Sequence, residues 1–159
     1  MRTKAAVARI MLLAACATSL QLSGLNGTAF GYEASKPRYA STIYGEAYAI
    51  DGDTIKLDGQ VKVRLSGVAA PERTERGGTE ATTFMKHLVN GKKVRCELDG
   101  TRSHDRVVGI CFLNDQDIGE AVIAAGLARD CPRFSGGKYA KVERSKASSL
   151  PLPRYCENR

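Results

Sequence analysis

The stretch DGDTIKLDGQVKVRLSGVAAPE, residues 51–72, predicts a β-hairpin with charged residues gathered at its open end. Residues 54–57 have the composition of a strand, Asp58-Gly59 is a favoured two-residue hairpin turn, and residues 60–65 form the returning strand. Side chains alternate across a strand, so the apolar residues of the return share one face. Arg64 belongs to the opposite face, and we expect it to be exposed.

The open end of this hairpin is where chemistry is expected. Asp51 and Asp53 precede the first strand and Glu72 follows the second, so pairing through the turn brings three carboxylates together with Arg64. Clustered carboxylates repel each other unless a cation offsets them, which indicates a hard-metal site or an acid/base site beside an anion clamp. An ordinary solvated turn has the same residue types, because Asp and Gly are common turn formers.

The order of several short motifs along the chain resembles the secreted thermonuclease, or staphylococcal-nuclease-like, family over about residues 47–150. These motifs are DGDTI, VRLSGV, APE, a Gly-rich loop, an amphipathic helix, GKKVRCEL, a DR pair and an ALARD-like helix end. The resemblance implies an α+β fold, a five-stranded OB-type β-barrel with about three packed helices. It also implies a calcium-dependent nuclease that hydrolyses the phosphodiester bonds of DNA and RNA.

The resemblance assigns roles to particular residues, and each role fits the chemistry of its side chain. Glu72 would take a proton from water as general base, while Arg64 and Arg106 would hold the phosphate through bidentate hydrogen bonds. Asp53, supported by Asp51, would bind Ca²⁺, a hard cation that polarises the phosphate. The backbone carbonyl of the residue before Pro71, Ala70, is a further candidate ligand. Apart from the resemblance, Arg106 is an ordinary charged strand residue.

Two departures from the family pattern affect these roles. The family usually reads Asp-x-Pro-Glu after the second strand, and its aspartate binds calcium directly, whereas this chain has Ala69 at that position. Ca²⁺ takes about six to eight oxygen ligands, so we expect weakened metal binding. In the loop before Arg106, Ser103 and His104 stand where the family has a lysine and a tyrosine that contacts a nucleotide phosphate.

The remaining sequence predicts further strands and helices around the hairpin. Apolar residues repeat at helical spacing in residues 79–90, where Gly91 ends the pattern. The other predicted elements are a strand at 42–50, strands at 92–98 and 106–113 joined by a loop at 99–105, and helices at 117–129 and 138–148.

Residues 1–31 are expected to be an export signal that is not part of the fold. Arg2, Lys4 and Arg9 precede a mostly apolar stretch that Thr and Ser interrupt, which is typical of a signal and too broken for a membrane span. The sequence Leu13-Ala14-Ala15-Cys16 also has the form of a lipobox, so a lipid anchor through Cys16 is the alternative. Residues 32–41 are expected to be a linker and residues 42–159 the domain.

The charge balance is compatible with a polyanionic partner. The chain has 24 basic and 17 acidic side chains, and loss of the three basic residues of the leader leaves 21 against 17. This moderate excess favours DNA or RNA without requiring it. A mature chain of this length suits one domain. We expect a monomer without an integral membrane span, exported to the periplasm or the medium.

Four of the five cysteines lie in the predicted domain, an even number that suits an oxidising compartment. Because the resemblance makes the strands at 92–98 and 106–113 antiparallel neighbours, we expect the disulfides Cys96–Cys111 and Cys131–Cys156. A structural zinc site is disfavoured, since no pair has the C-x₂₋₄-C spacing.

Two other classes of function stay open at this point. One is a catalytically silent OB-fold domain that binds nucleic acid, and the other is a disulfide-stapled accessory domain of the cell envelope. Retention of Arg64, Glu72 and Arg106 together favours the nuclease, because binding alone has no use for Glu72, whose charge repels phosphate.

Overall fold

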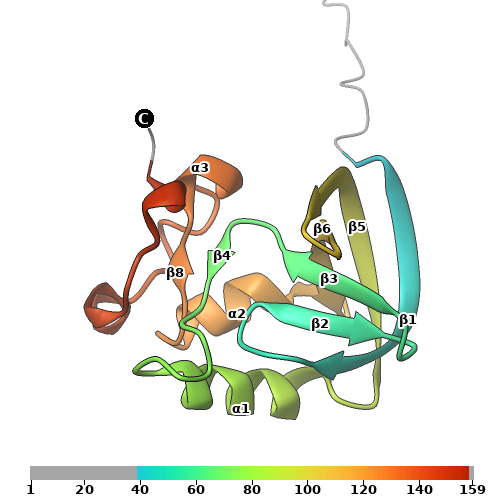
Figure 1. Cartoon of the computed structure of the whole chain (residues 1–159), viewed down its shortest axis with the longest axis horizontal. Helices are drawn as coiled ribbons and strands as arrows, with labels where there is room; N and C mark the ends of the chain where they lie inside the picture. The colour runs from blue at the N-terminus through green and yellow to red at the C-terminus, as the bar shows by residue number, and fades with distance from the viewer. Residues whose placement is uncertain (1–38, 158–159) are drawn as a thin grey trace, which may run out of the picture. The chain divides into compact units, whose positions relative to one another are not determined.

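The computed structural model describes residues 39–157, which form a closed β-barrel with helices packed on it (Figure 1). The predicted leader, with Cys16, and all but the end of the predicted linker lie outside the described residues. Within the described part, no helix is long and apolar enough to cross a membrane. The elements are β1 (Ser41–Ala49), β2 (Thr54–Leu57), β3 (Val61–Leu65), β4 (Val68–Ala69), α1 (Gly78–Val89), β5 (Lys92–Ser103), β6 (Arg106–Leu113), β7 (Gln116–Asp117), α2 (Ile118–Ala124), β8 (Arg129–Asp130), α3 (Pro132–Ser135), and the 3₁₀ helices η1 (Ser145–Ser149) and η2 (Arg154–Cys156).

Five strands make the barrel, as the resemblance implies. They are hydrogen-bonded in the order β3-β2-β1-β5-β6, with β7 added beyond β6. The barrel closes because β3 also pairs with β6 in parallel, with Arg64 opposite Val108. This closure brings β3 and the beginning of β6 together, although residues 64 and 106 are far apart in the sequence.

The hairpin of β2 and β3 lies where it was predicted, but its register is one residue away from that of a two-residue turn, because Leu57 lies opposite Val61. Thr54 lies opposite Arg64, and the chain reverses at Asp58 and Gly59, which have φ angles of 48° and 67°. Positive φ at both positions is what a tight hairpin turn needs, and Asp and Gly tolerate it. Val63 and Leu65 are buried as expected, but Val61 at the turn end is 41% exposed.

Strand β5 extends further than the sequence suggested, whereas β6 has the predicted bounds. The expected loop at residues 99–105 is mostly strand, because β5 continues to Ser103 after an irregularity in pairing between Leu98 and Arg102. The actual turn consists of His104 and Asp105, and His104 has a φ of 58°. The disulfide Cys96–Cys111 links residues that face each other in this ladder.

The helices differ from the predictions in length and number. Helix α1 matches its prediction closely and packs against β1 and α2. Helix α2 stops at Ala124, followed by Gly126 with a φ of 71°, so the predicted helix 117–129 is too long. The predicted helix 138–148 is wrong, since this segment forms turns and η1.

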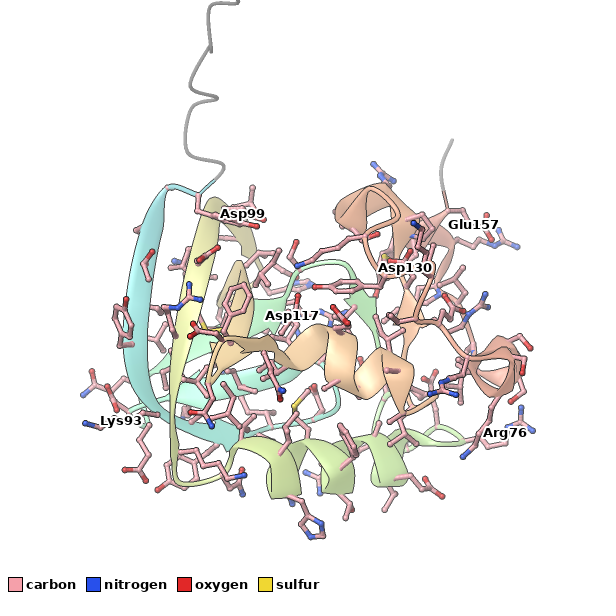
Figure 2. All side chains as sticks on the ribbon, turned by 180° about the vertical axis from the view of Figure 1, so that it is seen from behind. Arg76, Lys93, Asp99, Asp117, Asp130 and Glu157 are labelled. Atoms are coloured by element: carbon pink, nitrogen blue, oxygen red, sulfur yellow. A yellow bond between two sulfur atoms is a disulfide. The ribbon has the colours of Figure 1, made fainter. Side chains whose placement is uncertain are left out.

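A side-chain contact explains why the 138–148 segment is not a free amphipathic helix. The Tyr139 side chain is buried in the core, and its hydroxyl donates a 3.0 Å hydrogen bond to Asp117. Asp117 also caps α2 by accepting from the backbone N–H groups of Gly119 and Glu120 (Figure 2). Tertiary contacts with the cap of α2 therefore set this backbone, and helical propensity does not.

Candidate functional site

Arg64 and Arg106 line one pocket of about 280 Å³ at the closure of the barrel. Arg64 comes from β3 and Arg106 from the first position of β6, which the parallel pairing holds beside β3. The rest of the lining comes from the β3–β4 connection, the β5–β6 turn, the start of α3 and the C-terminal tail: Leu65, Ser66, Gly67, Val68, Ser103, His104, Val108, Cys131, Phe134 and Tyr155. The two arginines that the resemblance singled out therefore share one cavity.

Arg64 is largely but not fully buried, which corrects the expectation that it would be exposed. Its side chain is 14% exposed and is ion-paired to the Asp53 carboxylate, whose side chain is 9% exposed. The Arg64 Nη1 also donates to the Asp53 backbone carbonyl at 3.3 Å. Burial lowers the pKa of Arg64, and the positive charge of Arg106 lowers it too, whereas Tyr155 and Asp51 raise it. The guanidinium therefore sits in a partly desolvated place beside a second cation.

Asp53 and Asp51 form the acidic side of the site. Both Asp53 carboxylate oxygens are engaged, because Oδ2 accepts from the Ala70 backbone N–H at 3.1 Å and Oδ1 accepts from the Thr54 hydroxyl at 3.1 Å. The Asp51 carboxylate accepts from the Asp53 backbone N–H at 3.0 Å. Burial raises the pKa of Asp51, and its interaction with Thr54 and the charges of Arg64 and Arg106 oppose that rise.

Arg106 is held at its position by polar groups of the barrel. Its Nη1 donates to the Thr54 hydroxyl at 3.1 Å, its Nη2 to the Ser103 hydroxyl at 3.1 Å, and its Nε to the Ser103 carbonyl at 3.3 Å. None of these acceptors carries a charge, so the cation keeps its full charge toward the pocket. Arg106 and His104 also line a second hollow of about 270 Å³ with Asp51 and Lys62.

Glu72 lies outside this network. It follows β4 in the connection to α1, its side chain is exposed, and its backbone N–H donates to Glu75 at 2.8 Å. Among residues 39–157, its carboxylate has no hydrogen bond or ion pair. The predicted gathering of three carboxylates is not found, since no group of three His, Cys, Asp or Glu in the described residues is placed to hold a metal ion.

The residues at the site do not fit a calcium ion. Ca²⁺ needs about six to eight oxygens, but both oxygens of Asp53 are already used by Arg64, Ala70 and Thr54. Ala69, where the family has its third acid, is 1% exposed and packs against the Cys131–Cys156 disulfide. Apolar atoms therefore occupy the surroundings of the missing ligand.

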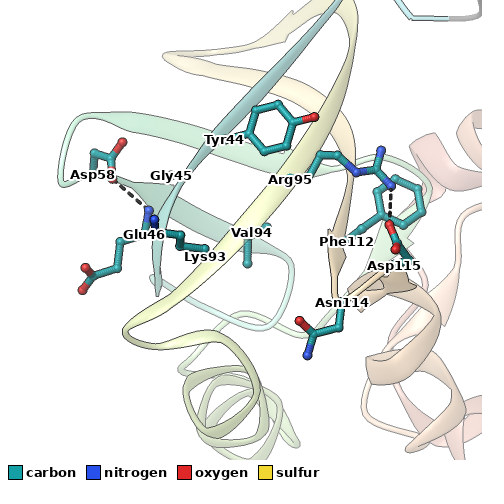
Figure 3. Close-up of a pocket in the computed structure, with 10 residues that line it drawn as sticks. All are labelled: Tyr44, Gly45, Glu46, Asp58, Lys93, Val94, Arg95, Phe112, Asn114 and Asp115. Carbon is teal, nitrogen blue, oxygen red and sulfur yellow. Dashed lines mark hydrogen bonds and ion pairs between the residues drawn. The ribbon is translucent and has the colours of Figure 1, made fainter.

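A larger hollow than the arginine-lined pocket lies elsewhere and holds none of the predicted site residues. It measures about 730 Å³ and lies over β1, β5 and the β6–β7 turn, with Tyr44, Glu46, Arg95, Phe112 and Asp115 among its lining (Figure 3). We call it the Arg95 groove. Its arginine is ion-paired with Glu97 and Asp115 and stacks on Phe112, 4.3 Å from the ring centroid. The charges of this groove therefore balance one another locally.

We call the pocket lined by Arg64 and Arg106 the arginine pocket, and sequence reasoning missed four residues that line it or contact its arginines. Thr54 and Ser103 orient Arg106 through their hydroxyls, and Phe134 and Tyr155 add two half-exposed aromatic rings. Thr54 belongs to the DGDTI motif, and Tyr155 is the neighbour of Cys156, so a weak signal was present for each. Nothing in the sequence pattern pointed to Phe134 or to Ser103 as an anchor.

The chain is similar in sequence to a known family and to several known proteins. Residues 62–148, more than half of the chain, match the family model of the staphylococcal nuclease homologues. The chain is 34% identical over 122 residues to the succinoglycan biosynthesis protein ExoI of Rhizobium meliloti, covering 69% of this chain and 63% of that protein. It is 29% identical over 112 residues to an uncharacterized endonuclease of Haemophilus influenzae, covering 68% and 63%.

A thermonuclease is also similar to this chain. The thermonuclease of Staphylococcus hyicus is 29% identical over 120 residues, covering 69% of this chain and 70% of that protein. The matched part of the chain spans 63% of the length of ExoI and of the Haemophilus endonuclease. The matched segment contains Arg64, Glu72 and Arg106. The chain belongs to the staphylococcal nuclease homologue family.

Proposed function

We propose that this protein is a nuclease that hydrolyses phosphodiester bonds of DNA or RNA in the arginine pocket. The observation that carries the proposal is the placement of Arg64 and Arg106 in one cavity at the closure of the barrel. Family membership and the relatives named as endonucleases and thermonuclease support the same reaction class. The excess of basic side chains favours a polyanionic substrate.

The electrostatics of the pocket suit a phosphate. Two guanidinium groups close enough for Arg106 to lower the pKa of Arg64 repel each other, and an anion between them removes that repulsion. As water attacks phosphorus, negative charge grows on the non-bridging oxygens, and prepositioned cations stabilise that charge more than they stabilise the ground state. The uncharged anchors of Arg106 leave its charge available for this purpose.

Glu72 is the proposed general base. Its exposed carboxylate has no partner in the described residues, and it is carried by the connection between β4 and α1. A carboxylate that takes the proton of the attacking water turns it into a better nucleophile. The bond from phosphorus to the leaving ester oxygen then breaks, the leaving oxygen takes a proton from solvent water to become an alcohol, and the two arginines retain the phosphate product.

Calcium is proposed to play only a weak part. The family resemblance implies Ca²⁺, and Asp51, Asp53 and the Ala70 carbonyl are the groups through which it would act. Since Asp53 is already bound to Arg64, the proposed mechanism takes no step through the metal. The charge that a metal would supply comes here from the two guanidinium groups.

A second candidate function is nucleic-acid binding without turnover. The Arg64–Asp53 ion pair favours it, because it commits part of the guanidinium to a protein carboxylate and leaves fewer donors for a phosphate. A silent envelope accessory domain would need neither arginine. Salt-dependent affinity for an oligonucleotide separates these two alternatives, since release of counterions gives affinity a steep salt dependence.

The setting of the protein is also a proposal. The disulfides Cys96–Cys111 and Cys131–Cys156 are consistent with an exported protein, because such bonds persist in oxidising compartments. We propose a monomer in the periplasm or the medium. Lipid attachment through Cys16 remains the alternative and concerns a residue outside the described part.

The test is cleavage of a fluorescent oligonucleotide by Glu72→Gln, with Glu80→Gln as matched control. Both glutamates are exposed, and Glu80 lies in the first turn of α1. We expect Glu72→Gln to lower kcat by at least about 10²-fold, the usual range for loss of a general base, and Glu80→Gln to retain activity. Absence of cleavage by the unmodified protein, with salt-dependent binding retained, would establish the binding module instead.

A further inference from the structure

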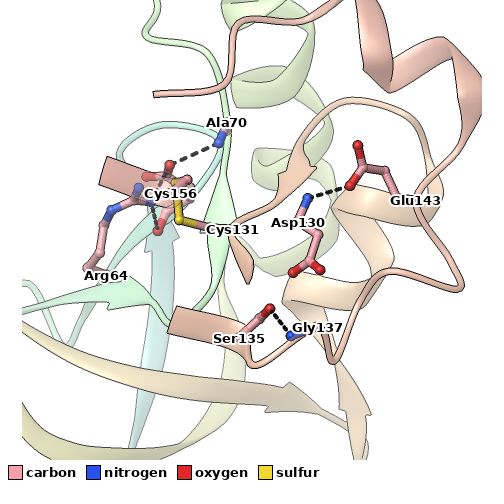
Figure 4. The surroundings of a disulfide bond; sticks show 9 residues. Arg64, Ala70, Asp130, Cys131, Ser135, Gly137, Glu143 and Cys156 are labelled. Atoms are coloured by element: carbon pink, nitrogen blue, oxygen red, sulfur yellow. Dashed lines mark hydrogen bonds and ion pairs between the residues drawn. A yellow bond between two sulfur atoms is a disulfide. The ribbon is translucent and has the colours of Figure 1, made fainter. Parts of the chain in front are cut away.

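The C-terminal tail is attached to the wall of the arginine pocket by a disulfide. Cys131 lines the pocket and follows β8, which pairs with β4. Cys156 ends η2 and is fully buried, with its Cα 4.6 Å from that of Cys131. Figure 4 shows this bond in the same region as Arg64 and Ala70. The disulfide therefore fixes residues 154–156 beside the site.

Tyr155 is brought into the pocket by this attachment. It precedes Cys156 directly, lines the pocket with Arg64 and Arg106, and is 51% exposed. Its ring lies 6.4 Å from that of Phe134, tilted by 59°, a common arrangement for paired aromatics. The ring is thus supported on one side by α3 and by the disulfide at its own backbone.

Tyr155 and Arg64 line the same pocket, and interaction with the Tyr155 hydroxyl raises the pKa of Arg64. Burial lowers the pKa of Arg64, and Tyr155 is the largest of the groups that raise it again. On another side the guanidinium is bound by the Asp53 carboxylate and carbonyl. A phenol oxygen that accepts from a guanidinium on its free side orients the guanidinium without cancelling its charge.

We propose that Tyr155 is a positioning residue for Arg64, and that the Cys131–Cys156 disulfide makes the phosphate clamp depend on the C-terminal tail. This inference rests on the proposed nuclease function and adds a part of the site to it. Without Tyr155, the charged Asp53 is the stronger remaining partner and draws the guanidinium away from the pocket. Reduction of the disulfide has the same effect, so full affinity for the substrate requires an oxidising environment.

The first experiment compares Tyr155→Phe with Tyr44→Phe in the full, disulfide-intact chain. Tyr44 is the matched control, because it is 70% exposed and lines the Arg95 groove. The probe is a phosphorothioate oligonucleotide, whose binding is followed by fluorescence anisotropy. We expect Tyr155→Phe to weaken affinity about tenfold, the range for a hydrogen bond to a charged group, and Tyr44→Phe to leave it unchanged.

A second readout follows Arg64 itself and needs no turnover. The Nε–H signal of Arg64 in a ¹⁵N-correlated NMR spectrum should shift and broaden in Tyr155→Phe and stay in place in Tyr44→Phe. A residue that only stabilises the tail would change the melting temperature without moving this signal at a temperature where the protein is folded. An unchanged Arg64 signal with unchanged affinity in Tyr155→Phe overturns the proposal.

The disulfide is tested with the double variant Cys131→Ser/Cys156→Ser, which keeps the barrel disulfide Cys96–Cys111. We expect the same loss of affinity, with no further loss when Tyr155→Phe is added, because both changes act through one contact. A gain of affinity or independent, additive losses would overturn the proposal. If the double variant does not fold, the affinity and the Arg64 NMR signal of Tyr155→Phe test the proposal without it. Failure of the nuclease proposal is a separate outcome, because it would appear as absence of cleavage by the unmodified protein.

Discussion

Arg64 and Arg95 are both arginines on barrel strands, yet their surroundings give them opposite properties. The Glu97 carboxylate raises the pKa of Arg95, while burial lowers the pKa of Arg64. Arg95 lies at the surface with Glu97, Asp115 and the Phe112 ring, so its charge is satisfied by its neighbours. Arg64 lies in a smaller cavity beside a second cation, Arg106.

This difference shows that charge balance identifies the candidate site better than size does. The Arg95 groove is the larger hollow, at about 730 Å³ against about 280 Å³ for the arginine pocket. Yet an anion gains little at a cation that is already neutralised and solvated. In the arginine pocket, Arg64 is also paired, with Asp53, but Arg106 donates only to the uncharged oxygens of Thr54 and Ser103. The charge of Arg106 therefore stays available in a partly desolvated space, where an interaction with a phosphate is worth more.

The largest expected effect comes from exchanging each arginine for lysine. Arg106→Lys keeps the charge but cannot reproduce the planar donor set that Thr54 and Ser103 orient. We expect about a 10²-fold loss of kcat/KM on a fluorescent oligonucleotide, the cost of removing one oriented donor from a developing anion. Arg95→Lys should cleave like the unmodified protein. Equal losses in the two variants would remove the distinction between the two regions.

The next effect concerns a buried carboxylate behind the arginine pocket, Asp130. It is 3% exposed, and its two oxygens have no geometrically good hydrogen bond from the described residues. Burial raises its pKa, while the Ser135 hydroxyl lowers it. The folded protein therefore holds this proton to higher pH than the unfolded chain does. Stability falls as pH rises from about 3.8 through the raised pKa, and the cost persists above it.

Replacing the Asp130 carboxylate tests whether its charge lowers the stability of the fold at neutral pH. Asp130→Asn should be more stable than the unmodified protein at pH 7 by on the order of 1 kcal/mol, and the difference should shrink as pH falls below 4. Asp115→Asn in the Arg95 groove is the control, since that side chain is 92% exposed and should change stability by less than about 0.5 kcal/mol. Urea unfolding at several pH values measures both. A lower stability of Asp130→Asn at pH 7 would refute this account.

The smallest expected effect is that of calcium. Because Asp53 is bound to Arg64 and Ala69 packs on a disulfide, millimolar Ca²⁺ should change cleavage by less than about tenfold and barely change the melting temperature. Mg²⁺ at the same concentration controls for ionic strength. Complete loss of cleavage in a chelator, restored by micromolar Ca²⁺, would mean that the Arg64–Asp53 pair opens to admit a metal.

The hairpin and its neighbours were predictable from the sequence alone. Alternating apolar residues and the Asp58-Gly59 turn specify β2 and β3, because each signal is local and the two agree. The helical repeat of α1 and the even number of cysteines are equally local signals. The ordered motifs then identified the barrel and, through the family, the two arginines.

Only the tertiary structure decided what surrounds those residues. Burial of Tyr139 against the cap of α2 overrode the helical pattern of residues 138–148. Closure of the barrel and the Cys131–Cys156 bond placed Asp53 and Tyr155 around Arg64, which strand alternation alone had left exposed. Alternation fixes the face on which a side chain lies, but contacts between distant segments determine whether that face meets water or protein.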